Sequence, residues 1–482
     1  MVETLEVLPD PVSLIESMRA IGYTPETALA DLIDNSISAE ASAISIEYDA
    51  VDEPFVAVLD NGYGMDAAQL TNAMRHGSRN PTDKRSLQDL GRFGLGLKTA
   101  SLSQCRRLTV ISKQGDQVHA RCWDLDVVQA ENRWVVVVPS TRERKKLPLY
   151  AELMAQANGT LVVWQSLDRL MSGASRPAAE MAVRMANLHS HLSFVFHRYT
   201  RREGNFAPID IAVNGLKLKL LDPFLKDNSF TQPLEGQTIR IDGEVISVQP
   251  YVLPHMSHLT IDEAEMAGGR EGLRSSQGFY VYRNRRLVIS GTWFRLVPKE
   301  EFFKLTRVQV DIPNSLDHLW SLDIKKSAAY PPDIIRDRLR DLIPHFATTS
   351  RTTITYPGRR RKHKVEFVPL WDRIEPSHGS FRYQLNPDHP VIRNLSDDLD
   401  AQSQKSLQDI LELIAAALPF ESIYSDMCGD RRFAASESEY TEIAAIAARI
   451  REITGLPLDA VLSLDPIAQV PQYHEQLRKE LA

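Results

Sequence analysis

The chain reads Asp60-Asn-Gly-Tyr-Gly-Met65 directly after an apolar run, Phe55-Val-Ala-Val-Leu59. The apolar run predicts a buried β-strand, and the Asp-Asn-Gly that follows it predicts a tight turn at the strand end. A carboxylate in this position can accept a hydrogen bond from a ligand, and an Asx-turn is the alternative interpretation of Asp60. The strand end therefore supplies the first candidate binding residue.

Three further polar or glycine-rich boxes lie before and after this turn. Before it, a segment with apolar residues at helical spacing contains Ala30-Asp-Leu-Ile-Asp-Asn35, whose carboxylates and Asn35 gather on the polar face. After it, a further helix opens with Gly91-Arg-Phe-Gly-Leu-Gly-Leu-Lys-Thr99, where backbone N–H groups and Lys98 can approach phosphates. The fourth box opens a late strand and reads Gly159-Thr-Leu-Val-Val-Trp164.

The composition is that of a soluble globular protein, because 43% of the 482 residues are hydrophobic and 25% are charged. Such a chain is long enough for two or three domains, each with its own core. The formal net charge of −7 argues against a surface built throughout for nucleic acid. Any contact with DNA would therefore have to come from local basic patches.

The cysteines and the apolar runs indicate the compartment. Cys105, Cys122 and Cys428 are too far apart in the sequence for a Cys-x-x-Cys zinc clip or a disulfide framework, which suggests a reducing environment. The first residues lack a signal-peptide pattern, and the longest apolar runs are too short to cross a bilayer. We therefore expect a cytoplasmic protein that does not enter the membrane.

Helix and strand patterns alternate in the first third of the chain and predict an α/β sandwich with helices on one face of the sheet. A connecting helix and a second set of strands, closed by a helix, predict a second α/β domain, and a basic connector leads to a mainly helical remainder. We expect strands at 44–48, 55–59, 108–112, 118–125, 134–138, 160–164, 209–221, 237–253, 278–290 and 307–313, and later helices at 181–202, 332–343, 400–418 and 437–453. The expected domains are residues 1–195, 196–345 and 346–482.

The four boxes, in this order and spacing, resemble the GHKL superfamily of ATPases, which includes gyrase, heat-shock chaperones, histidine kinases and MutL. Within that superfamily the chain looks most MORC/MutL-like, and residues 76–89 resemble a nucleotide lid. The resemblance covers roughly residues 10–170 and extends more loosely to residue 345. It implies a GHKL α/β sandwich, a transducer-like second α/β domain, and binding and hydrolysis of ATP with Mg²⁺.

The resemblance also implies roles for individual residues. Asp60 would accept a hydrogen bond from the adenine amino group, with space for the base left by two glycines. Asn35 would offer a neutral oxygen to the Mg²⁺ ion that bridges the phosphates. Thr160 is similar to the threonine that supports the adenine-binding aspartate, with a β-strand threonine of no special role as the alternative. The implied nucleotide contacts are Asn35, Asp60, Gly62, Gly64, Met65, Gly91, Gly94, Gly96, Lys98, Thr99 and Thr160.

The expected catalytic carboxylate is Asp31. ATPases of this kind carry Glu four residues before the Asn, where it orients the attacking water, and this chain has Asp there. One missing methylene moves the carboxylate by ~1 Å, which can cost on the order of 10²-fold, so we expect slow turnover. Asp34 is the second candidate. A lysine of the second domain would reach the γ-phosphate, and we favour Lys326 over Lys325, with a solvated pair of lysines as the alternative.

These features together predict an ATP-driven conformational switch that forms a homodimer on ATP. By resemblance it would act in a DNA-directed process such as repair or restriction-type, antiviral defence, with DNA and a nuclease or another repair or defence protein as partners. An ATP-dependent chaperone, which shares the nucleotide pocket, is the alternative. Basic residues cluster around Arg283, Arg285 and Arg286 and again at residues 359–364, and each cluster could contact DNA phosphates or be solvated.

Overall fold

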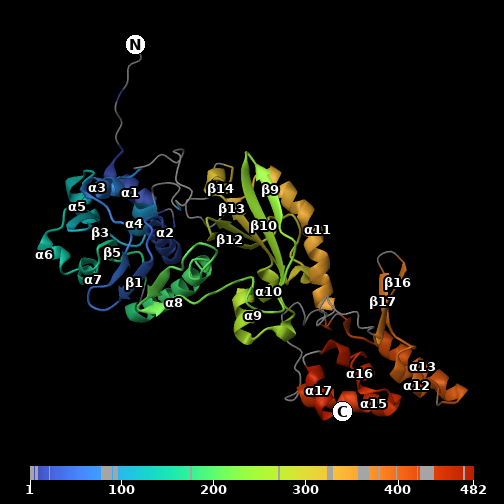
Figure 1. The fold of residues 1–482 in the computed structure, drawn as a ribbon. Coiled ribbons are helices and arrows are strands. Elements are labelled where there is room, and N and C mark those ends of the chain that lie inside the picture. The colour runs from blue at the N-terminus through green and yellow to red at the C-terminus, as the bar shows by residue number, and fades with distance from the viewer. Residues whose placement is uncertain are drawn as a thin grey trace. The chain divides into compact units, whose positions relative to one another are not determined.

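Figure 1 shows the computed structural model of the chain, which confirms the expected fold class of α/β elements followed by a mainly helical C-terminal part. It describes residues 5, 9–20, 22–77, 90, 96–173, 176–269, 272–317, 319–322, 329–355, 368–377, 380–397, 399–420, 422–423, 439–470 and 473–481. Two compact units are formed by residues 1–251, 276–298 and 307–343, and by residues 252–275, 299–306 and 344–482. Within the described ranges, none of the helices combines the length and apolar character needed to cross a lipid bilayer.

The first unit contains a seven-stranded sheet. Its strands are β1 (Ala43–Asp49), β2 (Phe55–Asp60), β3 (Arg107–Gln114), β4 (Gln117–Asp124), β5 (Asn158–Gln165), β6 (Asp210–Val213) and β7 (Leu216–Lys217). The order is β4-β3-β5-β2-β1-β6-β7, and all neighbours are antiparallel except β1 and β6. The register places Asp60, the last residue of β2, opposite Ile44 and Thr160.

Eight helices accompany this sheet in the described part of the unit. They are α1 (Pro11–Arg19), α2 (Pro25–Ser38), α3 (Ala67–Met74), α4 (Gly96–Leu102), α5 (Leu125–Glu131), α6 (Thr141–Arg144), α7 (Tyr150–Ala155) and α8 (Pro177–Val195). Helix α2 begins after a capped residue, because the Thr24 hydroxyl accepts a hydrogen bond from the Thr27 N–H and Pro25 follows at the first helical position.

The side chains on both faces of the central strand β2 are buried. Val56 and Val58 belong to the main core with residues of α1, α2, α4 and α8. Ala57 and Leu59 belong to a second cluster that includes Leu153 of α7. Successive residues of a strand point to opposite faces, so the uniformly apolar β2 needs a cover on each side. The expectation of helices on one face alone was therefore wrong.

Two expected strands differ in the structure. Residues 134–138 do not form a strand; only Val137 pairs, through reciprocal backbone bonds of 2.8 Å with Cys122 on the edge strand β4. Trp134 instead packs its ring edge-on against Trp123. The strands β6 and β7 continue the first sheet, although the sequence suggested that residues 209–221 open the second domain. The domain boundaries at residues 195 and 345 remain a prediction.

A second, six-stranded sheet lies mainly in the same unit. Its strands are β8 (Gln232–Pro233), β9 (Gln237–Ile241), β10 (Glu244–Val252), β11 (Gly278–Arg283), β12 (Arg286–Thr292) and β13 (Thr306–Ile312). They follow the order β12-β11-β13-β10-β8, with β9 paired to β10, and β11 runs parallel to β13. Phe224, Tyr280, Tyr282 and Leu287 form a core on this sheet. A short pair, β14 (Ser321–Leu322) and β15 (Ala329–Tyr330), precedes α11 (Asp333–Thr355), which continues past the expected end at residue 343.

The second unit is mainly helical. It contains α9 (Ile261–Gly268), α10 (Gly272–Ser275), the hairpin of β16 (Trp371–Ser377) and β17 (Ser380–Leu385), α12 (Pro390–Asp397), α13 (Ala401–Ala416), α15 (Glu439–Thr454), α16 (Leu458–Val461) and α17 (His474–Glu480). Its core includes Ala447 and Ile450 of α15 with Val461 and Leu477. The helices expected at residues 400–418 and 437–453 correspond to α13 and α15.

Candidate functional site

The carboxylate of Asp60 is buried at the end of β2, where three donors bind it. Its Oδ1 accepts hydrogen bonds from the backbone N–H groups of Gly62 (2.9 Å) and Thr160 (3.2 Å). Its Oδ2 accepts one from the hydroxyl of Ser36 in α2 (2.9 Å). Burial raises the pKa of Asp60, and the three hydrogen bonds act in the opposite direction. The hydrogen bond from Gly62 to Asp60 closes an Asx-turn, so the alternative interpretation of Asp60 is correct as far as the turn is concerned. The same bonds also fix the direction of the carboxylate as a hydrogen-bond acceptor.

Two serines complete this site, and the sequence analysis missed both. Ser36 lies on the buried side of α2, directly after Asn35, and binds Asp60. The hydroxyl of Ser112 accepts a hydrogen bond from the Met65 N–H (2.8 Å) and lies 2.9 Å from the hydroxyl of Thr160. A polar residue inside an apolar helical stripe was the available signal for Ser36. No sequence pattern pointed to Ser112, because its partners come from other strands and turns.

The glycines of the Asp60 turn are required by close backbone contacts. A Cβ on Gly62 would lie 2.7 Å from the Ala39 carbonyl oxygen, and one on Gly64 would lie 2.1 Å from the Lys113 carbonyl oxygen. Gly64 also has a φ of +70°, which side chains rarely adopt. Glycine is needed at these two positions because a side chain would collide with the backbone of neighbouring segments. Their role in leaving space for a base remains a prediction.

Helix α2 places Asp31 and Asn35 one turn apart. Asp31 is buried, and its Oδ2 accepts a hydrogen bond from the Tyr23 hydroxyl (3.0 Å). A Cβ on Gly96 would lie 3.3 Å from the same oxygen, so this carboxylate faces the first residue of α4. Asn35 is exposed. The structure therefore brings the expected water-orienting carboxylate beside Gly96, the last glycine of the glycine-rich box.

The exposed amide of Asn35 fits the expected magnesium role. The described residues contain no group of three or more His, Cys, Asp or Glu side chains that could hold a metal ion. A magnesium ion that travels with a nucleotide needs only one or two protein oxygens, since phosphates and water supply the others. One accessible neutral oxygen on α2 meets that requirement.

Asp34 forms a buried ion pair with the second sheet. The Nε of Arg286, the first residue of β12, lies 2.8 Å from the carboxylate, and the side chains of Asp34 and Arg286 are 1% and 5% exposed. Arg286 also lies over the ring of Phe196. This buried ion pair agrees with a structural role for Asp34. As a catalytic candidate, Asp34 was placed behind Asp31 on the basis of the sequence. It ties the helix that carries Asp31 and Asn35 to the second sheet.

The start of α4 supplies Lys98 and Thr99, which are both buried. The Nζ of Lys98 donates a hydrogen bond to the carbonyl of Ala73 at the end of α3 (2.8 Å). Burial lowers the pKa of Lys98 to about 8. A lysine whose charge is this sensitive to its surroundings is typical of functional sites, although structural lysines share this property. Its contact with phosphate remains a prediction.

Several predicted residues lie outside the described part of the chain. They are Gly91 and Gly94 of the glycine-rich box, most of the lid-like loop, the lysines Lys325 and Lys326, and the basic residues at 359–364.

The basic turn between β11 and β12 is not an exposed patch, which corrects the expectation that it contacts DNA or is solvated. Asn284 and Arg285 both have positive φ and form the turn. Arg283 is buried, binds the carboxylate of Asp317 through contacts of 2.6 to 3.0 Å, and donates to the Leu90 carbonyl. The guanidinium of Arg285 stacks on the rings of Tyr199 and Phe206 and lies 3.4 Å from Glu203. Because Arg286 is paired with Asp34, all three arginines have a carboxylate partner in the same unit.

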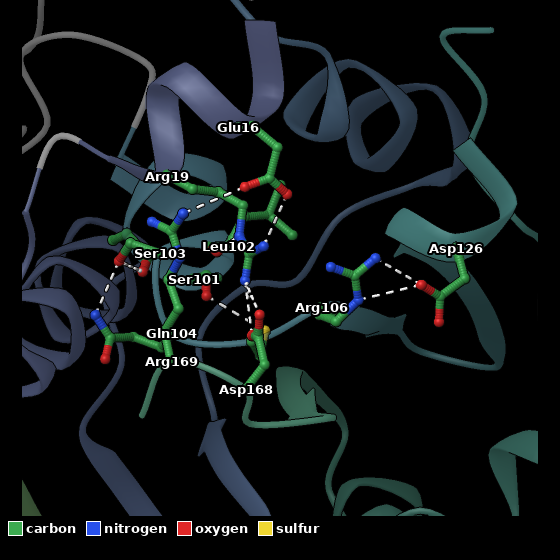
Figure 2. A network of polar contacts seen from close by, with 12 residues as sticks. Glu16, Arg19, Ser101, Leu102, Ser103, Gln104, Arg106, Asp126, Asp168 and Arg169 are labelled. Carbon is green, nitrogen blue, oxygen red and sulfur yellow. Dashed lines mark hydrogen bonds and ion pairs between the residues drawn. The ribbon is translucent and has the colours of Figure 1, made fainter. Parts of the chain in front are cut away.

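A polar network holds α4 against α1, as Figure 2 shows. The Nε of Arg19 donates to the carbonyl of Leu102, the last residue of α4 (2.7 Å), and Nη2 binds both oxygens of Asp168 (2.6 and 2.7 Å). Beside it, the side-chain amide of Gln104 donates to the backbone carbonyl of Tyr23 (3.0 Å). The arginine satisfies a carbonyl that the helix end leaves without an intrahelical donor. The helix that begins at Gly96 is thereby anchored at its other end.

The site lies in the part of the chain that is similar to known proteins. Residues 23–160 match the family model described as "Histidine kinase-, DNA gyrase B-, and HSP90-like ATPase". This range contains Asp31, Asn35, Asp60, Lys98 and Thr160. The matched segment therefore includes the described residues of the site.

Several curated relatives carry the name DNA mismatch repair protein MutL, and three of them show the extent of the similarity. The protein of Herminiimonas arsenicoxydans is 29% identical over 142 residues, which is 29% of this chain and 23% of the relative. The proteins of Colwellia psychrerythraea and Neisseria meningitidis serogroup C are both 34% identical, over 24% of this chain and 18% of the relative. The chain thus spans about a fifth of the length of these relatives.

A solved structure titled "Crystal Structure of N terminal domain of a DNA repair protein" is also similar. It is 16% identical with a TM-score of 0.43, and the match covers 70% of this chain and 98% of that chain.

Proposed function

Because residues 23–160 match the "Histidine kinase-, DNA gyrase B-, and HSP90-like ATPase" model and this chain is similar in part to MutL proteins, we propose that it is an ATP-driven conformational switch of the GHKL superfamily. In this proposal the domain binds ATP with Mg²⁺, and slow hydrolysis resets the bound state. The observation that carries the proposal is the Asp60 site. There one buried acceptor is oriented by a hydroxyl from α2, a backbone N–H of the turn and a backbone N–H of β5.

Each group of the site has a role in the proposal. Asp60 accepts the hydrogen bond of the adenine amino group, and Asn35 gives its oxygen to the magnesium ion. The ion neutralises phosphate charge when it is bound. Asp31 orients the attacking water, since its carboxylate faces Gly96, the last glycine of the glycine-rich box. Lys98 adds positive charge to the phosphate side, for which its Nζ must leave or share the carbonyl of Ala73.

The switch requires a route from the nucleotide to the second sheet. The ion pair of Asp34 with Arg286 supports such a route, because Asp34 lies between Asp31 and Asn35 on α2 and Arg286 begins β12. A displacement of α2 would therefore act directly on the turn between β11 and β12. The lysine that reaches the γ-phosphate in this proposal is Lys326.

The DNA-directed process is supported by the names of the relatives, and the protein partners are proposed from the family resemblance alone. A DNA mismatch repair protein acts on DNA, and we extend this process class to the present chain as repair or restriction-type defence. The proposal includes an ATP-dependent homodimer and a nuclease or another repair or defence protein as partner. Light scattering with a slowly hydrolysed ATP analogue measures the dimer.

An equilibrium titration of ATP with Mg²⁺ tests the pocket. Asp60→Asn keeps the size of the side chain but replaces a charged acceptor, so affinity should fall about tenfold or more. Asp116→Asn is the matched control, since Asp116 is exposed on the turn between β3 and β4. Equal affinity of the Asp60→Asn variant and the control would remove Asp60 from the pocket.

Turnover assays with added polymers test the process. Duplex or single-stranded DNA should stimulate hydrolysis, and this stimulation should weaken with salt if it depends on phosphate contacts. Stimulation by an unfolded protein and not by DNA would instead support the chaperone alternative.

A further inference from the structure

We propose that Tyr23 is a positioning residue that fixes the carboxylate of Asp31 toward the phosphate side of the site. The inference rests on the proposed function, because it deepens the role given there to Asp31. It also explains how an aspartate can stand where ATPases of this kind carry glutamate. The proposal depends on three observations: the contact of the tyrosine with Asp31, the direction of that carboxylate, and the anchoring of the tyrosine itself.

The hydroxyl of Tyr23 meets the carboxylate directly. The oxygen of this hydroxyl lies 3.0 Å from Asp31 Oδ2, and the two residues are only 7% and 4% exposed. The hydroxyl is the donor of this bond when the carboxylate is ionised, because an ionised carboxylate accepts only. At 3.0 Å the contact lies at the long end of the range of O–H···O hydrogen bonds, and such a bond still favours one direction of the carboxylate. The tyrosine therefore selects one of the two carboxylate oxygens.

The selected oxygen points to the expected phosphate side. A Cβ on Gly96 would lie 3.3 Å from Oδ2 and 3.6 Å from Cγ of Asp31. The last torsion of an aspartate side chain is broad, so the plane of its carboxylate is set by its partners rather than by rotamer preference. A donor on Oδ2 therefore contributes directly to the direction in which the carboxylate faces Gly96, the residue that opens α4.

The backbone of Tyr23 is held in place by Gln104. The Nε2 of Gln104 donates to the Tyr23 backbone carbonyl (3.0 Å) and lies 2.9 Å from the hydroxyl of Ser103. Gln104 is 3% exposed, and Figure 2 shows it next to Ser103 at the end of α4. The tyrosine also belongs to the main core of the first unit. Its hydroxyl is thus fixed relative to both α2 and α4.

This arrangement compensates for the reach of the shorter side chain. An aspartate places its carboxylate ~1 Å short of the position that a glutamate reaches, and a misplacement of this size can cost on the order of 10²-fold in rate. The aspartate can orient water effectively only if its carboxylate stays in one direction. In this proposal Tyr23 acts through Asp31 and not on the nucleotide, so its effect belongs to turnover and not to binding.

The variant Tyr23→Phe tests the proposal, because it removes the hydroxyl and keeps the ring in the core. Turnover of the full chain should fall about 10- to 100-fold, while equilibrium affinity for ATP with Mg²⁺ should be unchanged. Tyr280→Phe is the matched control, since Tyr280 is also buried and donates its hydroxyl to a carbonyl, that of Ser276 (2.6 Å). That control should keep wild-type turnover.

A double-mutant cycle with Asp31→Asn separates positioning from a merely structural role. If Tyr23 acts through the Asp31 carboxylate, Tyr23→Phe should cause no further loss of turnover in the Asp31→Asn background. An equal fold-loss in both backgrounds, or full turnover of Tyr23→Phe alone, would overturn the proposal. If Tyr23→Phe does not fold, Gln104→Met takes its place, and it should lower turnover with affinity unchanged; unchanged turnover would count against the proposal.

The proposed function fails by different results. Absence of ATP binding or hydrolysis in the wild-type chain would overturn both statements. Full turnover of Asp31→Asn alone would remove Asp31 from catalysis and Tyr23 with it, while leaving the nucleotide pocket intact. Loss of turnover in Asp31→Asn together with normal turnover in Tyr23→Phe would reject only the positioning role.

Discussion

Removal of the Arg286 guanidinium should destabilise the first unit strongly. Arg286 and Asp34 form an ion pair at 2.8 Å whose side chains are 5% and 1% exposed. Arg286→Ala leaves a carboxylate buried without the guanidinium, and breaking a buried pair in this way costs about 3–5 kcal/mol. Because a domain unfolds with a free energy of about 5–15 kcal/mol, the variant should lose a large part of its stability. The bond between α2 and β12 therefore has a measurable stability effect.

Denaturant unfolding followed by circular dichroism measures this free energy, with comparison at an unchanged m-value. Arg340→Ala is the control, since its pair with Asp337 in α11 has a similar distance of 2.8 Å but side chains that are 54% and 65% exposed. Loss of such an exposed pair should cost only about 0–1 kcal/mol. The contrast isolates burial as the cause.

A variant without either charge makes the test sharper. Asp34→Leu combined with Arg286→Met removes both buried charges of the pair, so it should be less destabilised than Arg286→Ala. The reasoning would be refuted by a loss below about 1 kcal/mol in Arg286→Ala, or by a double variant that loses the sum of the single effects.

The remaining predictions concern Asp31 and Lys98. Asp31→Asn should keep nucleotide affinity and lose most turnover, because an amide cannot accept the proton of the attacking water; titration and turnover measured side by side decide this. Asp31→Glu, which restores the usual reach, should hydrolyse at least as fast as wild type unless the site has adjusted to the shorter side chain, and turnover far below wild type would support such an adjustment. Nucleotide affinity should fall as the pH rises through about 8, because burial lowers the pKa of Lys98 to about 8 and the neutral amine above that pH no longer attracts phosphate. Binding measured on both sides of that pH tests this, and Lys98→Met should remove the dependence; a wild-type affinity that does not change would exclude Lys98 from the phosphate contacts.

Local features of the site could be predicted from the sequence. The apolar run before Asp60 gives a strand, the Asp-Asn-Gly gives its turn, and the apolar residues at helical spacing around Asp31 and Asn35 give α2. Each of these depends on neighbouring residues, whose effect on the backbone is strong and short in range. The roles that the resemblance assigns to these residues remain predictions.

Contacts between distant segments could not be predicted in this way. Asp34 and Arg286 are 252 positions apart, and neither the helical period of α2 nor the pattern of β12 contains information on the other. The same holds for Ser112, which contacts Met65 and Thr160 from two other segments. Glycine positions were easier, because the turn requires them, although their neighbours in the structure are carbonyl oxygens of protein backbone.

The basic turn between β11 and β12 shows why a run of arginines is weak support for a DNA surface. A charge contributes to DNA affinity by releasing counterions from phosphates, which requires that it be accessible. Arg283 and Arg286 are buried on Asp317 and Asp34, and Arg285 lies between aromatic rings beside Glu203. To bind a phosphate, each would have to leave a carboxylate that already neutralises it, and for the two buried pairs this would also break contacts of the first unit. If the chain binds DNA, neutralisation of Arg285 should therefore leave the salt dependence of binding unchanged, so the cations that set this dependence must lie elsewhere. A smaller salt slope in Arg285→Gln would show that the turn opens to meet DNA.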